Sequence, residues 1–148
     1  MRSKKIDPSP SNGSGQKTFA IIFDAGDRVV EGLKSFAVEQ GLAASHFTAI
    51  GAFKDVLLAY FDCDKKEYQK IPVHEQLEVL SLVGDITIKD GTPNIHAHVV
   101  LGKRDSSTCG GHLMEAEVRP TLEVILTESP AHLERRFDEA AGLPLISI

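Results

Sequence analysis

Three of the six histidines of this 148-residue chain lie in one segment, NIHAHVVLGKRDSSTCGGHL, at residues 94–113. His96 and His98 are one residue apart in an apolar run, and His112 follows two glycines. Side chains at positions i and i+2 of a β-strand share a face, with about 6.5–7 Å between their Cα atoms. Two imidazoles at that spacing can converge on one ion, with His112 as the candidate third ligand. Three neutral imidazoles and an open fourth position are typical of zinc sites that activate water. The alternative is that these histidines are only exposed or hydrogen-bonded strand residues.

The simplest pairing of this segment raises a difficulty for His112 as a ligand. If the two strands flanking the loop form a plain hairpin, His98 lies roughly opposite Glu115. His96 then lies opposite Glu117, and His112 must lean in from the loop or come from a neighbouring subunit. A carboxylate such as Glu115 could be the third ligand instead, and two histidines with one carboxylate favour non-haem iron. Either glutamate could also act as a general base.

The residues just before His112 allow two interpretations. Paired glycines let a backbone approach a ligand closely or adopt positive φ, and a hairpin loop has the same need of glycine. Cys109, which precedes the glycines, could add a thiolate, although a lone cysteine is more often inert.

The bulk composition is that of one ordinary globular domain, with 42% apolar and 25% charged residues. The two cysteines, Cys63 and Cys109, fit a reducing compartment and not a disulfide framework. The formal net charge of −5 works against non-specific nucleic-acid binding. Because no stretch resembles a secretory signal or an apolar membrane span of roughly 18 residues, we expect a cytoplasmic protein without membrane contact.

The elements that must position the histidines are mainly strands. Helical spacing of apolar residues predicts one helix after a turn at residues 24–27, with Asp27 as N-cap and Gly41 as C-cap. A second helix is expected over residues 129–143, where Ser129 suits the N-cap and a proline follows it. Short apolar or alternating runs predict strands over residues 17–24, 45–62 (as two strands broken near Gly51), 67–73, 75–91, 94–102, 112–118, 121–128 and 144–148.

This order of elements has no βαβαβ alternation. It favours an α+β fold, a largely antiparallel mixed sheet flanked by a few helices. Residues 1–16 are polar and rich in Pro, Gly and Ser, so we expect a flexible tail there and a single domain over residues 17–148.

Three segments resemble the plants-and-prokaryotes-conserved (PPC) domain family. HAHVVLGKRDSSTCGGHLMEAEVRPTLEVILTE is similar to its signature block, through HxHxxLG, GGH and RPTLEV. LEVLSLVGDI is similar to the central strand motif that plant members write as Gly-Arg-Phe-Glu-Ile-Leu-Ser. GDRVVEGLKSFAVEQGLAASHFTAIGAFKDVLLAYFD resembles its N-terminal helix and strand pair. The resemblance covers about residues 17–142.

The resemblance implies an α+β, PPC-like fold that assembles as a homotrimer. It also implies that His96, His98 and His112 match histidines that form a zinc-type site near a subunit interface in some prokaryotic members. Plant members join the domain to AT-hook segments that bind DNA, and bacterial relatives are often labelled DNA-binding proteins. This chain has no Arg-Gly-Arg-Pro hook, and its segment HEQLEVL lacks the Gly-Arg-Phe start that is associated with partner contacts in plants.

Three functions therefore stay open at this point. The first is a DNA-binding, regulatory trimer with a metal site of zinc or another divalent transition metal at His96, His98 and His112. The second is a metal-dependent enzyme or small-molecule binder whose substrate and catalytic residues the sequence does not identify. The third is a structural trimeric scaffold.

Overall fold

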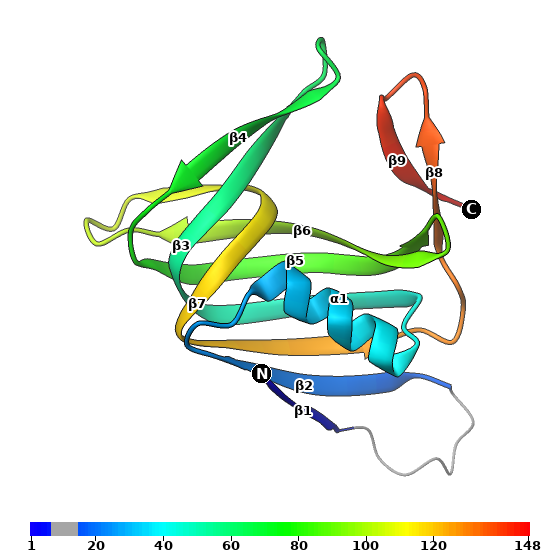
Figure 1. Cartoon of the computed structure of the whole chain (residues 1–148), viewed down its shortest axis with the longest axis horizontal. Coiled ribbons are helices and arrows are strands. Elements are labelled where there is room, and N and C mark those ends of the chain that lie inside the picture. Colours follow the sequence, from blue (N-terminus) through cyan, green and yellow to red (C-terminus); the bar gives the residue numbers. More distant parts are fainter. Residues whose placement is uncertain (7–14) are drawn as a thin grey trace.

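The computed structural model describes residues 1–6 and 15–148, and this part of the chain is mostly β. Nine strands form one mixed sheet, accompanied in the described residues by a single helix (Figure 1). The elements in chain order are β1 (Arg2–Lys5), β2 (Lys17–Asp24), α1 (Val29–Gln40), β3 (Ala44–Asp62), β4 (Glu67–Val73), β5 (Leu77–Lys89), β6 (Thr92–Gly102), β7 (Thr108–Glu128), β8 (Glu134–Asp138) and β9 (Leu143–Ser147).

Two long strands, β3 and β7, hold the sheet together. The strand order is β1-β2-β7-β3-β5-β8-β9, with β4 paired to β3 and β6 paired to both β5 and β7. The strand β3 has 19 residues and β7 has 21, and their pairing register shifts three times along their length. Such irregularities bend a strand, which lets β3, β5, β6 and β7 pair in a closed ring. The named strands pair antiparallel throughout, except for one parallel contact between β5 and β8.

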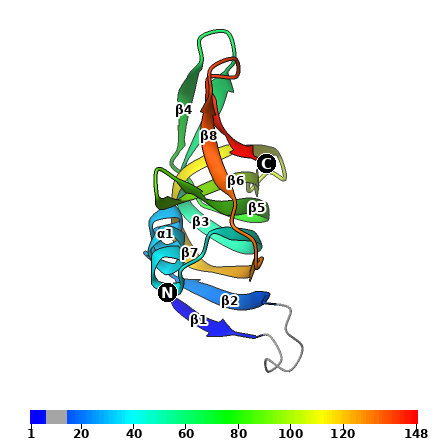
Figure 2. The ribbon, with the colours of Figure 1, turned by 90° about the vertical axis from the view of Figure 1, so that its right-hand side faces the viewer.

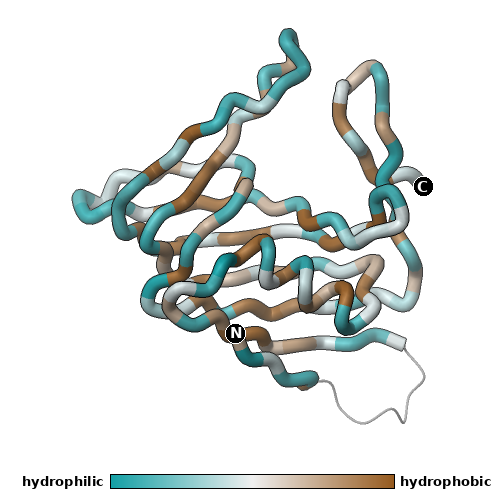
Figure 3. Tube along the Cα trace, in the orientation of Figure 1, coloured by the Kyte–Doolittle hydropathy of each residue, from teal (hydrophilic) through white to brown (hydrophobic). Residues whose placement is uncertain are grey.

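Helix α1 covers one face of the sheet (Figures 1 and 2). Its apolar residues recur at helical spacing and are buried against the strands: Val29, Leu33, Phe36 and Ala37. Phe36 meets Phe19 of β2 edge to face, with ring centroids 5.2 Å apart, and burying one such ring stabilises the fold by about 1.5–3 kcal/mol. Apolar residues follow the central strands, while the tip of the β3–β4 hairpin is mostly hydrophilic (Figure 3). In the described residues no helix is long and apolar enough to cross a bilayer.

Two hairpins, β3–β4 and β8–β9, project from the sheet on the same side (Figure 1). The second hairpin replaces the helix expected over residues 129–143, so that expectation is wrong. Local signals at Ser129 and Pro130 favoured a helix. The side chain of Arg135 instead reaches Thr87 and Asp85 on β5, and these long-range contacts outweigh local propensity.

Other sequence-based expectations are confirmed or need adjustment. The first helix exists and ends at Gly41 in the left-handed conformation, but Asp27 does not cap it. The N-cap is Arg28, which makes no side-chain cap bond, while Asp27 accepts a hydrogen bond from the backbone of Asp24. The runs on either side of Gly51, and those on either side of Pro120, are each one bent strand and not two.

The first residues of the segment expected to be a tail form a strand. Arg2–Lys5 forms β1 along β2, and Arg2 pairs with Asp24 at 2.8 Å. The expectation for residues 7–14 lies outside the described residues.

Candidate metal centre

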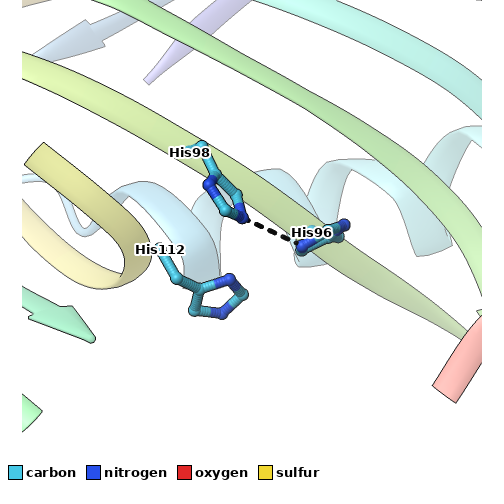
Figure 4. Close-up of side chains that lie close together, drawn as sticks. All are labelled: His96, His98 and His112. Atoms are coloured by element: carbon cyan, nitrogen blue, oxygen red, sulfur yellow. Dashed lines mark hydrogen bonds between the residues drawn. The ribbon is translucent and has the colours of Figure 1, made fainter. Parts of the chain in front are cut away.

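The three histidines singled out from the sequence meet on the open face of the sheet, the face opposite α1 (Figure 4). Each offers a ring nitrogen, and these three atoms all lie within 4.8 Å of one another. Two ligands of a tetrahedral zinc, with bonds of about 2.0–2.1 Å, lie about 3.3 Å apart. The distance between Nε2 of His96 and Nε2 of His98 is 3.3 Å. The pair is therefore already spaced for one ion.

The register of β6 and β7 places His112 directly opposite His98. The pairing begins at Gly102 and Thr108, so the connecting loop is short and the two glycines belong to β7. This corrects the plain-hairpin expectation, in which Glu115 faced His98. All three imidazoles come from one chain, and His112 needs neither the loop nor a neighbouring subunit to reach the others.

The glycine pair is what allows this register. A Cβ atom at Gly110 would collide with the carbonyl oxygen of Val99 on β6. A Cβ atom at Gly111 would lie 2.9 Å from the carbonyl oxygen of Ala59 on β3. Glycine here permits close approach of three backbones and is not a loop requirement. Cys109 packs beside the core and is not among the grouped ligands.

The two glutamates considered from the sequence have other partners. The carboxylate of Glu115 accepts hydrogen bonds from the backbone N–H groups of Val30 at 2.8 Å and Glu31 at 3.1 Å. It therefore caps the start of α1, the role that the sequence assigned to Asp27. Glu117 pairs with Lys54 at 2.9 Å. The set of two histidines and one carboxylate is thus not the set that the structure assembles.

His96 is held from behind by two residues that the sequence did not single out, Asp85 and Arg135. Nδ1 of His96 lies 3.6 Å from the Asp85 carboxylate and 3.1 Å from Nη2 of Arg135. The guanidinium of Arg135 also donates a hydrogen bond to the Asp85 carboxylate at 2.9 Å, and the Arg135 side chain is only 7% exposed. Burial alone would raise the pKa of Asp85, but hydrogen bonds from His96 and Arg135 outweigh burial and lower it. These contacts orient the ring so that its Nε2 faces His98.

His112 carries a buried ring nitrogen with no hydrogen-bond partner, Nδ1. Figure 4 shows this nitrogen on the side of the ring toward the other two histidines. Leaving such an atom unpaired costs about 1–3 kcal/mol, and a metal ion would satisfy it. Burial lowers the pKa of His112 to about 4, helped by the nearby charges of His96, His98 and Arg135. Burial and His96 likewise lower the pKa of His98. Both rings are therefore kept neutral at pH 7, as ligands must be.

Comparison with known proteins gives one family and several solved relatives. The sequence matches the Plants and Prokaryotes Conserved (PCC) domain, also abbreviated PPC, over residues 10–130. A metal-containing protein from Archaeoglobus fulgidus is 42% identical, with a TM-score of 0.84 over 89% of this chain and 94% of that chain. A plant- and prokaryote-conserved protein from Pyrococcus horikoshii is 34% identical, with a TM-score of 0.84 over 88% and 91% of the two chains.

A more distant relative shares the fold alone. It is a candidate DNA-binding protein from Ralstonia eutropha, 24% identical, with a TM-score of 0.83 over 88% of this chain and 90% of that chain. None of the curated proteins compared with the chain matches it significantly.

Proposed function

The chain belongs to the Plants and Prokaryotes Conserved domain family, and we propose that it is a metal-binding homotrimer of that family. Its site is the group of His96, His98 and His112, and its ion is a divalent transition metal, zinc in the first place. The observation that carries the proposal is the convergence of three ring nitrogens within 4.8 Å, one of them buried without a partner. The relative from Archaeoglobus fulgidus, 42% identical, is itself a metal-containing protein.

The donor set suits zinc. His96 and His98 would bind through Nε2 and His112 through Nδ1, which leaves the fourth position of a tetrahedral ion for water or another ligand. Binding at Nε2 of His96 would leave Nδ1 facing Nη2 of Arg135 at 3.1 Å and the Asp85 carboxylate at 3.6 Å, the two groups that hold the ring from behind. When bound, the ion supplies a Lewis acid that activates water or polarises an oxygen ligand. His98 is exposed, so the group is open to solvent.

The open face of the sheet supports assembly of several copies. Five large apolar side chains on it are between 47% and 62% exposed: Ile50, Leu80, Val83, Val100 and Ile125. Contiguous apolar patches of this kind are typical of surfaces that partner subunits cover. Val83 lies opposite His98 in the β5–β6 register, so the apolar face reaches the histidine group. The number of three copies follows from the family resemblance.

The charges favour a metal ion over DNA as the ligand. The chain carries a net charge of −5, and several cations that could contact phosphates are paired with carboxylates. These pairs are Arg2–Asp24, Lys54–Glu117, Lys103–Glu75 and Arg135–Asp85. We therefore expect no retained complex with duplex DNA in a gel at low salt. A retained band that weakens steeply as salt is added would restore the DNA-binding role.

Elemental analysis tests the metal site. The protein is purified without a metal-affinity tag, incubated with zinc and freed of excess metal. We expect one zinc per chain, reduced to background in a His96→Ala/His98→Ala double variant. A His46→Ala/His132→Ala variant loses two exposed histidines outside the group and should keep its zinc. Zinc far below one per chain, unchanged by the first pair of substitutions, would end the proposal.

A further inference from the structure

A pocket of about 360 Å³ opens beside the histidine group and is lined by residues of β4, β5, β6, β7, β8 and β9. Figure 1 shows how the β3–β4 and β8–β9 hairpins project from the sheet on the same side. His96 and His112 are among its lining residues, so a molecule in the pocket would lie next to the group. Ligand pockets span roughly 300–1,000 Å³, which places this one at the small end. Most of its remaining wall is apolar, contributed by Tyr68, Ile95, Met114, Leu143, Pro144 and Leu145.

The charged side chains that line the pocket are both cations. They are Lys89 and Arg135, and none of the described aspartates and glutamates lines it. Arg135 is balanced by Asp85, and its N–H groups also reach Thr87 and the carbonyl of Pro144. Lys89 is half-buried, and within residues 1–6 and 15–148 no carboxylate lies at ion-pair distance from it. A partly desolvated cation without a counter-charge favours an anionic ligand.

We propose that this pocket binds a small carboxylate with a short apolar chain. The carboxylate lies between Lys89 and the histidine group, and the chain lies against the apolar wall. The metal contact rests on the function proposed above, whereas Lys89 and the apolar wall do not depend on it. A bare phosphate would satisfy Lys89 but leave the apolar wall uncovered, so we commit to a carboxylate with an apolar chain.

The sizes of the expected effects follow from these contacts. Each buried methylene tightens binding about four-fold, so 3-methylbutanoate should bind at least about ten-fold more tightly than acetate. Loss of the Lys89 charge removes one charge-assisted hydrogen bond and should weaken carboxylate binding by about three- to ten-fold.

Calorimetric titration of zinc-loaded and metal-free protein tests the proposal. The probes are acetate, 3-methylbutanoate, inorganic phosphate and the neutral 3-methylbutanamide. We expect 3-methylbutanoate to bind most tightly, and more tightly to the zinc-loaded protein than to the metal-free one. Lys89→Gln should weaken the binding of both carboxylates, and it should leave the binding of the amide and the uptake of zinc unchanged. Lys34→Gln, an exposed lysine of α1 on the opposite face, should change nothing.

The outcomes separate this proposal from the metal site. If zinc binds but 3-methylbutanoate binds no better than its amide or phosphate, or Lys89→Gln has no effect, the pocket proposal is overturned and the metal site stands. If no zinc is taken up, the proposed function fails. The pocket proposal is then tested with the metal-free protein alone. It stands if this protein binds 3-methylbutanoate more tightly than the amide and if Lys89→Gln loses that preference, and it falls otherwise.

Discussion

The burial of His112 should make the metal-free protein less stable in acid. Its pKa is about 4 in the folded protein, against an ordinary value of 6.5. Between these two values the unfolded chain binds a proton that the folded chain does not. The contribution of His112 is therefore complete above about pH 6.5 and is lost as the pH falls toward 4.

The size of this effect follows from the two pKa values. A pKa of 6.5 in the unfolded chain and of about 4 in the folded protein lowers the free energy of unfolding by about 2 kcal/mol on going from pH 7 to pH 5. The His112 ring is only partly buried, so solvent screening reduces that figure, and we expect about 1 kcal/mol.

Urea unfolding at pH 7 and pH 5 measures this loss. The metal-free protein is used at one fixed concentration, because the stability of an oligomer depends on concentration. Between the two pH values, the free energy of unfolding of the wild type should fall by about 1 kcal/mol more than that of His112→Gln. His132→Gln, which removes an exposed histidine outside the group, should behave as the wild type. Equal pH dependence in His112→Gln and the wild type would refute the reasoning.

Three further substitutions test the other contacts. Glu115→Ala removes the acceptor at the start of α1 and should lower the free energy of unfolding by about 1–2 kcal/mol without changing zinc uptake; a thermal melt with unchanged stability would contradict the cap. Asp85→Asn removes the negative charge beside His96 and should lower zinc affinity by about 10–100-fold in a competition titration against a chelating dye. An unchanged affinity would argue against a role of Asp85 in orienting His96. Leu80→Asp places a carboxylate on the open apolar face and should give monomers in sedimentation velocity, whereas an unchanged assembly would exclude that face as the interface.

Part of the site could be predicted because strand periodicity is local. His96 and His98 fall on one face for any strand with a period of two, whatever it packs against. The position of His112 was harder to predict, because it depends on where the loop ends. Gly110 and Gly111 allow the backbone of β7 to approach those of β6 and β3 closely, and this close approach depends on the tertiary structure.

The residues behind the site could not be found from spacing. Asp85 lies opposite His96 only through the β5–β6 register, and Arg135 arrives from a hairpin that local signals predicted as a helix. The buried guanidinium joins β5, β6 and β9 through side-chain contacts that leave no periodic pattern in the sequence. Contacts of this kind depend on packing and follow from the assembled fold alone.

X-ray diffraction at the zinc absorption edge tests the central claim most directly. Crystals of tag-free protein loaded with zinc should show one anomalous peak per chain, about 2.0–2.1 Å from one ring nitrogen each of His96, His98 and His112. Loaded crystals with no peak between these three rings, or with the zinc bound by other residues, would contradict the account.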